Sequence, residues 1–166
     1  MKGKVLRKEV GEAITSLIVA ILLAIVVKIL WSSLGLTLVV VEGHSMLPLF
    51  QSGDLVLVER VPPTSIHVGD IVVYRGCGGH LIIHRVVSVC NDGGVYCFIT
   101  WGDNNKIPDT PDMTCSNCPC RLVFRSGYSI LWMGVGYKRI IGKVVEVNGY
   151  IYKVPYLGAL SLLLRG

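Results

Sequence analysis

The chain has 166 residues, enough for one compact domain and hardly enough for two. Apolar residues make up 52% of it and charged residues only 16%, a balance that is unusual for a wholly soluble domain. The net charge of +5 owes four of its units to Lys2, Lys4, Arg7 and Lys8, just ahead of the most apolar stretch. This clustering is typical of a membrane topology determinant, so we expect no nucleic-acid partner.

The apolar stretch at residues 13–31 carries a single charge, Lys28. As a helix it would be about 28 Å long, close to the hydrocarbon thickness of a bilayer. Lys28 could extend its stem to the interface beside Trp31. A buried core helix or a cleavable signal peptide would share part of this pattern, but no convincing small-x-small cleavage site follows and the chain runs straight into a predicted strand. We expect a retained membrane anchor, with residues 1–12 as a cytoplasmic basic leader and the rest of the chain outside.

After the anchor, short β-branched runs alternate with turns rich in Gly, Pro, Asp and Asn. The runs occupy residues 36–42, 54–60, 70–75, 81–89, 95–100, 121–124, 140–147 and 150–155. Many short strands with almost no helical periodicity predict a mainly β fold, an antiparallel and partly closed β-domain over residues 36–155. The apolar tail at 156–166 is too short to span a membrane and is expected to form an interfacial or core-packed segment.

All six cysteines follow the anchor, and an even number outside the cytoplasm favours disulfides. They are Cys77, Cys90, Cys97, Cys115, Cys118 and Cys120. Cys90 and Cys97 flank a predicted hairpin and are expected to pair with each other, while the last three are expected to supply links to a loop near Cys77. The crowded "CSNCPC" segment leaves a structural zinc knuckle open as an alternative.

Ser45 lies at the edge of a predicted strand in "VEGHSMLPLF" and becomes a nucleophile only if a base takes its proton. His84, in "LIIHRVVSV", is the one histidine embedded in an aliphatic run, although a hydrogen-bonded structural histidine would fit the same pattern. His44 would point to the opposite face from Ser45 in an extended chain. His67 and His80 fall in predicted turns. His84 is therefore the candidate base.

Three carboxylates follow in "GDNNKIPDTPD", namely Asp103, Asp109 and Asp112. A carboxylate that orients a histidine and stabilises its imidazolium is the usual third member of a serine hydrolase site. An Asx-rich turn would have the same composition. The spacing of an EF-hand calcium loop is not met.

Six segments in chain order now form a recognisable set: "GHSMLPLFQSGDLVLV", "VGDIVVY", "IIHRVV", "WGDNN" with a later Asp, "IIGKVV" and "VPYLG". Together they resemble the motifs of type I signal peptidases, peptidase family S26, over nearly the whole chain. Bacterial members carry a lysine base where this chain has His84. The chain is therefore similar to the archaeal and endoplasmic-reticulum branch, which has a Ser-His-Asp site.

The resemblance implies a role for each matching residue. Ser45 matches the nucleophile and His84 the general base. Asp109, six residues after the aspartate of Gly-Asp-Asn-Asn, matches the functional carboxylate, and Asp103 would support the site by hydrogen bonding. Asp112 stays open as an alternative to Asp109.

Gly43 stands where some bacterial relatives place an oxyanion-binding hydroxyl. Any oxyanion hole would therefore use backbone N–H groups, including that of Ser45. Gly43 and Met46, on either side of the nucleophile in the Gly-x-Ser-Met-x-Pro motif, are expected to support the site. The cysteine-rich segment 113–120 has no assigned counterpart in the family.

The implied function is a membrane-bound serine endopeptidase that removes N-terminal signal peptides after small residues at P1 and P3. Its partners would be preprotein signal peptides, the lipid bilayer, and other membrane subunits or the translocon, with no cofactor and no metal. Ser45 lies fourteen residues after Trp31, so the catalytic domain is expected near the extracytoplasmic face of a single-pass protein.

Two other functions fit parts of the sequence. A LexA-like self-cleaving domain would need a serine–lysine pair and a DNA-binding segment, which the anchor and His84 disfavour. A catalytically silent, membrane-anchored β-module that binds a partner could retain every residue named above. Only an activity measurement separates that module from a peptidase.

Overall fold

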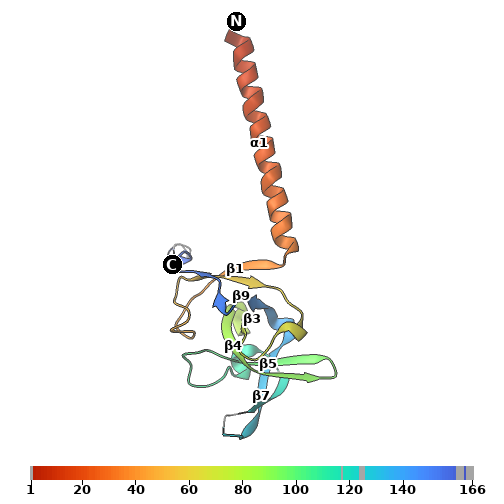
Figure 1. The fold of residues 1–166 in the computed structure, drawn as a ribbon, viewed down its shortest axis with the longest axis vertical. Helices are drawn as coiled ribbons and strands as arrows, with labels where there is room; N and C mark the ends of the chain where they lie inside the picture. Colours follow the sequence, from red (N-terminus) through yellow and green to blue (C-terminus); the bar gives the residue numbers. More distant parts are fainter. Residues whose placement is uncertain (1, 117, 124–125, 160–162, 164–166) are drawn as a thin grey trace. The chain divides into compact units, whose positions relative to one another are not determined.

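The computed structural model describes residues 2–116, 118–123, 126–159 and 163. These residues form two units, a helical one up to Leu36 and a β-rich one from Thr37 (Figure 1). Parts of the predicted leader and tail, at residues 1, 160–162 and 164–166, lie outside the described residues.

The first unit is one continuous helix, α1 (Lys2–Ser33), which includes the predicted leader as well as the predicted anchor. Within it, Val10–Trp31 has a mean hydropathy of 2.8 over its most apolar window and is long enough to cross a membrane. Its side chains are exposed, as in a helix that faces lipid. By length and composition, the helix is compatible with membrane anchoring.

The second unit is a mainly antiparallel β-domain. Nine strands of the described chain form one sheet in the order β1-β2-β8-β3-β4-β5-β7-β6, with β11 pairing β2. Their bounds are β1 (Leu36–Val40), β2 (Leu55–Glu59), β3 (Ile71–Arg75), β4 (Leu81–Asp92), β5 (Val95–Trp101), β6 (Cys118–Val123), β7 (Ser129–Gly136), β8 (Ile140–Val144) and β11 (Lys153–Val154). The successive pairs from β2 to β6 run antiparallel and the path does not close on itself. The predicted mainly β, antiparallel fold is confirmed.

Smaller elements connect these strands. They are the ribbon of β9 (Glu146–Val147) and β10 (Tyr150–Ile151), the short helix α2 (Pro111–Thr114), and three 3-10 turns, η1 (Pro63–Ser65), η2 (Cys77–Gly79) and η3 (Tyr137–Arg139). Strand β7 was not among the predicted runs, although it lies between β5 and β6 in the sheet.

Strand β3 occupies the centre of the sheet because its sequence is apolar on both faces. Ile71 and Val73 pack in one hydrophobic cluster, with Met46 and Phe50, while Val72 packs with Tyr74 and other residues in a second cluster. Ile71–Tyr74 are all buried, which requires cover on both sides of the strand. Burying each such valine or isoleucine is worth about 1.5–3 kcal/mol. The strand that carries Tyr74 is therefore a rigid support for its neighbour β4.

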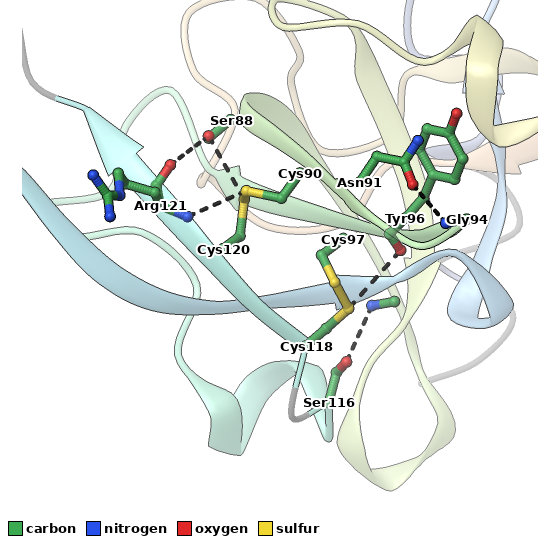
Figure 2. The surroundings of a disulfide bond; sticks show 11 residues. Ser88, Cys90, Asn91, Gly94, Tyr96, Cys97, Ser116, Cys118, Cys120 and Arg121 are labelled. Carbon is green, nitrogen blue, oxygen red and sulfur yellow. Dashed lines mark hydrogen bonds between the residues drawn. A yellow bond between two sulfur atoms is a disulfide. The ribbon is translucent and has the colours of Figure 1, made fainter.

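The six cysteines form three disulfides, but not in the predicted pairing. Cys90 and Cys97 face each other in register on β4 and β5, yet each bonds to β6: Cys90 to Cys120 and Cys97 to Cys118 (Figure 2). The Cα atoms of the two bonded pairs are 5.4 and 5.6 Å apart. The predicted Cys90–Cys97 bond is therefore wrong, because β6 lies close enough to offer each cysteine a partner outside the hairpin.

The third disulfide joins Cys77 in η2 to Cys115 at the end of α2, with their Cα atoms 5.3 Å apart. The predicted link from the cysteine-rich segment to the loop at Cys77 is thus confirmed. A zinc knuckle is contradicted, because all six sulfurs are used in disulfides. The bond tethers the segment that follows β5 and contains Asp109.

A buried carboxylate ties the Ser45 side of the domain to its C-terminal part. Asp54 is 1% exposed and accepts hydrogen bonds from the Gln51 N–H at 3.0 Å, from Lys153 Nζ at 2.9 Å and from the Tyr156 N–H at 3.4 Å. Burial alone would raise the pKa of Asp54, but these donors outweigh it and hold the pKa below its ordinary value.

We expect Asp54→Asn to lower the free energy of unfolding by about 1–3 kcal/mol near neutral pH, since the change removes the buried negative charge that accepts hydrogen bonds from three partly buried donors. A folded-state pKa below the unfolded value contributes stability that is present above the unfolded pKa and is lost as pH falls through the folded pKa. The difference from wild type should therefore shrink below about pH 4. Denaturation of the full chain in detergent across pH checks this, with the exposed Asp92→Asn as control; an effect of equal size at all pH values would contradict it.

Candidate active site

His84 lies on β4, the middle one of the three paired strands β3, β4 and β5 in the centre of the sheet. It lies on β4 opposite Val72 of β3 and is 2% exposed. Tyr74 pairs with Ile82 on one side of His84, and Thr100 pairs with Val86 on the other. Paired residues share a face and the side-chain period along a strand is two. Tyr74 and Thr100 therefore flank His84 on the same face of the sheet.

Asp109 comes to the same point from the segment between β5 and α2. Its Oδ2 lies 2.7 Å from His84 Nδ1 and accepts hydrogen bonds from the Tyr74 hydroxyl at 2.7 Å and the Thr100 hydroxyl at 2.6 Å. Its backbone is fixed as well, because Asp109 N–H donates to the Thr100 carbonyl and Trp132 Nε1 donates to the Asp109 carbonyl. The carboxylate is 2% exposed, so charge on the His84–Asp109 pair is shielded from water.

Ser45 lies in the turn after β1 and is half-buried. The turn opens at Gly43, whose φ of 94° lies in the left-handed region that favours glycine. A Cβ built on Gly102 would lie 2.7 Å from the Ser45 carbonyl oxygen and 2.8 Å from His84 Nε2. The Ser45 carbonyl oxygen and His84 Nε2 therefore both lie close to the same side of Gly102. This places the Ser45 turn beside Nε2, the ring nitrogen of His84 that does not face Asp109. No side chain would fit at residue 102.

The Gly-Asp-Asn-Asn segment holds this turn in place. The Asn104 N–H donates to the Ser45 carbonyl at 2.8 Å, and Asn104 Nδ2 donates to the His44 carbonyl at 3.1 Å. Met46, next to Ser45, is 2% exposed and packs in the cluster with Phe50. One buried side chain and one loop therefore restrain the backbone on both sides of the serine.

The other predicted carboxylates lie elsewhere. Asp103 accepts two hydrogen bonds from Arg85, at 2.8 Å from Nε and 2.7 Å from Nη2, which raise the pKa of the guanidinium. Arg85 also donates to the Gly69 carbonyl. Asp103 thus contacts the neighbour of His84 rather than His84 itself. Asp112 is exposed in the first turn of α2, and it is Asp109 that the structure brings to His84.

Sequence reasoning missed Tyr74, Thr100 and Asn104. Tyr74 and Thr100 looked like ordinary strand residues, and only the pairing register shows that they flank His84. One signal could have found Tyr74: its hydroxyl follows an apolar strand sequence that is buried on both faces. A polar atom in such a place needs a hydrogen-bond partner. Among the described residues, no group of three or more His, Cys, Asp or Glu side chains is arranged to hold a metal ion.

Comparisons with known proteins place the chain in a family. Residues 24–111, which include Ser45, His84 and Asp109, match the family model described as Peptidase S24-like. The chain belongs to the S24-like peptidase family.

Two curated relatives of this S24-like chain carry more specific names. The human "Signal peptidase complex catalytic subunit SEC11C" is 30% identical over 130 residues, covering 77% of this chain and 57% of the relative. The "Signal peptidase complex catalytic subunit SEC11" of Chaetomium globosum is 34% identical over 129 residues, covering 76% of this chain and 63% of the relative. The chain spans less than two thirds of the length of these relatives. The predicted resemblance to signal peptidases of the endoplasmic-reticulum type is confirmed.

Proposed function

We propose that this S24-like chain is a membrane-bound serine endopeptidase that removes N-terminal signal peptides from preproteins. The observation that carries the proposal is the buried His84–Asp109 pair, with His84 Nε2 beside the Ser45 turn. A serine that lies beside a histidine, with the histidine bonded to a carboxylate, supplies the parts of a nucleophilic acyl-transfer site. The names of the two curated relatives support the substrate class.

In this mechanism His84 Nε2 accepts the Ser45 Oγ proton while Oγ attacks the carbonyl carbon of the scissile bond. The same proton then passes to the leaving amine, which becomes the N-terminus of the mature protein. Asp109 accepts the hydrogen bond from His84 Nδ1–H and stabilises the imidazolium. His84 next takes a proton from water as the water oxygen attacks the acyl-enzyme carbonyl, and it returns that proton to Ser45 Oγ as the bond from the acyl carbon to Oγ breaks, which releases the signal peptide with a new carboxylate. General-base assistance contributes about 10²–10⁴ to the rate.

The tetrahedral oxyanion would be bound by backbone N–H groups, because Gly43 offers no hydroxyl two residues before Ser45. Substrate would bind as an extended strand, with small side chains at P1 and P3 facing shallow pockets. Helix α1 would anchor the enzyme with its N-terminus in the cytoplasm and the β-domain outside, where the three disulfides are stable. Other membrane subunits or the translocon would be its partners.

Cleavage of a preprotein by membranes that contain the wild type or Ser45→Ala tests the proposal. We expect the wild type to release the mature protein and Ser45→Ala to lose activity by at least about 10⁴-fold, since removing any member of a triad disables the whole unit. Ser52→Ala, a serine of the neighbouring turn, is the matched control and should keep activity. Equal cleavage by wild type and Ser45→Ala would refute the mechanism, and no cleavage by either would favour a silent binding module.

A further inference from the structure

The Tyr74 hydroxyl is a buried group for which the mechanism above has no use. Tyr74 is 0% exposed, and its hydroxyl donates to Asp109 Oδ2 at 2.7 Å. Its ring also meets the His84 imidazole edge-on, with the ring centroids 6.5 Å apart. Removing a phenol from water this completely is costly unless its O–H has a partner. Here the partner is the carboxylate that faces the proposed base.

The Tyr74 hydroxyl keeps its proton throughout the ordinary pH range. Burial raises the pKa of Tyr74 well above its usual value, and the charge on Asp109 raises it further. The group is thus a permanent donor to Asp109, while Thr100 adds a second donor that does not titrate. Both bonds converge on the same oxygen that faces His84 Nδ1.

We propose that Tyr74 is a positioning residue that adjusts the proton affinity of the His84–Asp109 pair through its hydrogen bond to Asp109 Oδ2. Hydrogen-bond donors to a carboxylate stabilise its ionised form and reduce the negative charge available to its other partners. The pair therefore takes up its next proton at a lower pH than it would without the phenol. More of the His84 ring stays neutral near pH 7, and a neutral ring is required of a general base. The role in catalysis rests on the proposed function.

The other charged groups near this pair are already neutralised by partners. Arg85, next to His84 on β4, pairs with Asp103 at 2.7 Å. Lys143, in the same cross-strand row as Val72 and His84, pairs with Asp70 at 2.9 Å. Tyr74 and Asp109 are thus the titratable groups in direct contact with His84 among the described residues.

The test is the titration of His84 in the full chain in detergent micelles, followed by NMR of ring-labelled histidine. The chain has four histidines, and the His84 resonance is identified as the one missing from His84→Gln. We expect Tyr74→Phe to raise the midpoint by about one pH unit, since the free energy of a one-unit shift is about that of one hydrogen bond to a charged group. Thr100→Val should shift it in the same direction, and Thr100→Ser, which keeps a hydroxyl, should restore the wild-type midpoint.

Tyr137→Phe is the matched control: Tyr137 packs against the same hydrophobic cluster as Tyr74, and its hydroxyl bonds the Val61 carbonyl at 2.7 Å instead of Asp109. It should leave the His84 midpoint unchanged. In cleavage assays Tyr74→Phe should move the acidic limb of the pH profile of kcat to higher pH, with KM nearly constant. A midpoint that is unchanged or lowered in both Tyr74→Phe and Thr100→Val would overturn the proposal. Absence of cleavage by the wild type would refute the proposed function alone, since the titration is measured without substrate.

Discussion

His84→Ala should abolish preprotein cleavage, with a loss of about 10⁴-fold or more in kcat, because it removes the imidazole that bonds Asp109 and lies beside the Ser45 turn. His84 is 2% exposed on a central strand, so the variant also opens a cavity. His84→Gln fills that space and should be equally inactive. Initial rates of cleavage in reconstituted membranes measure the effect, and circular dichroism shows whether the variants fold.

His44→Ala and His67→Ala are the controls for this result. His44 is exposed, and its carbonyl, which accepts hydrogen bonds from Asn104 Nδ2 and the Leu47 N–H, is kept in the alanine variant; the side chain of His67 is 73% exposed. Both variants should retain most of the activity. Near-normal turnover by His84→Ala or His84→Gln would remove His84 as the base. His84→Lys should not restore activity, because a lysine base has to be neutral and the adjacent Asp109 favours its cation.

Asp109→Asn should reduce kcat by about 10³–10⁴-fold with little change in KM. The amide is nearly the same size as the carboxylate, but its NH₂ group can turn toward His84 and leave Nδ1 without an acceptor, which selects the wrong tautomer. Single-turnover and steady-state cleavage separate this loss of chemistry from a loss of binding. The free energy of unfolding, measured in parallel, separates it from misfolding.

Asp112→Asn provides the matched control, three residues further on in the exposed first turn of α2. It should leave kcat within about twofold of the wild type, as for a surface substitution away from the site. A damaging Asp112→Asn together with a silent Asp109→Asn would reverse the assignment. Asp103→Asn should cost less than Asp109→Asn, since Asp103 acts on Arg85.

Much of the sheet could be predicted from local sequence, because its strands are β-branched runs bounded by turn residues. Strand β7 was not predicted, because "SILWMGVG" carries two glycines, which are poor strand formers. One of them, Gly134, has a structural reason: a Cβ there would lie 2.6 Å from the Phe98 carbonyl oxygen of β5. Close approach of two strands is a tertiary property that a single run of residues does not reveal.

The candidate site was predictable in its residue types and less so in its contacts. Ser45 and His84 stood out because a hydroxyl and an imidazole are unusual where they lie. The choice between Asp109 and Asp112 depends on how the chain leaves β5, and the backbone bond from Asp109 N–H to the Thr100 carbonyl sets that path. The Cys90–Cys97 prediction was wrong for a similar reason, since it considered the hairpin without its neighbour β6.

The register of β4 has a consequence for when the protein becomes active. Because side chains alternate along a strand, a slip of one residue would turn His84 away from Tyr74, Thr100 and Asp109 and onto the opposite face. In the proposed mechanism, a newly made chain therefore carries its nucleophile on a local turn but acquires its base only when three strands have paired correctly. By that mechanism, chains that are still folding would not yet cleave one another.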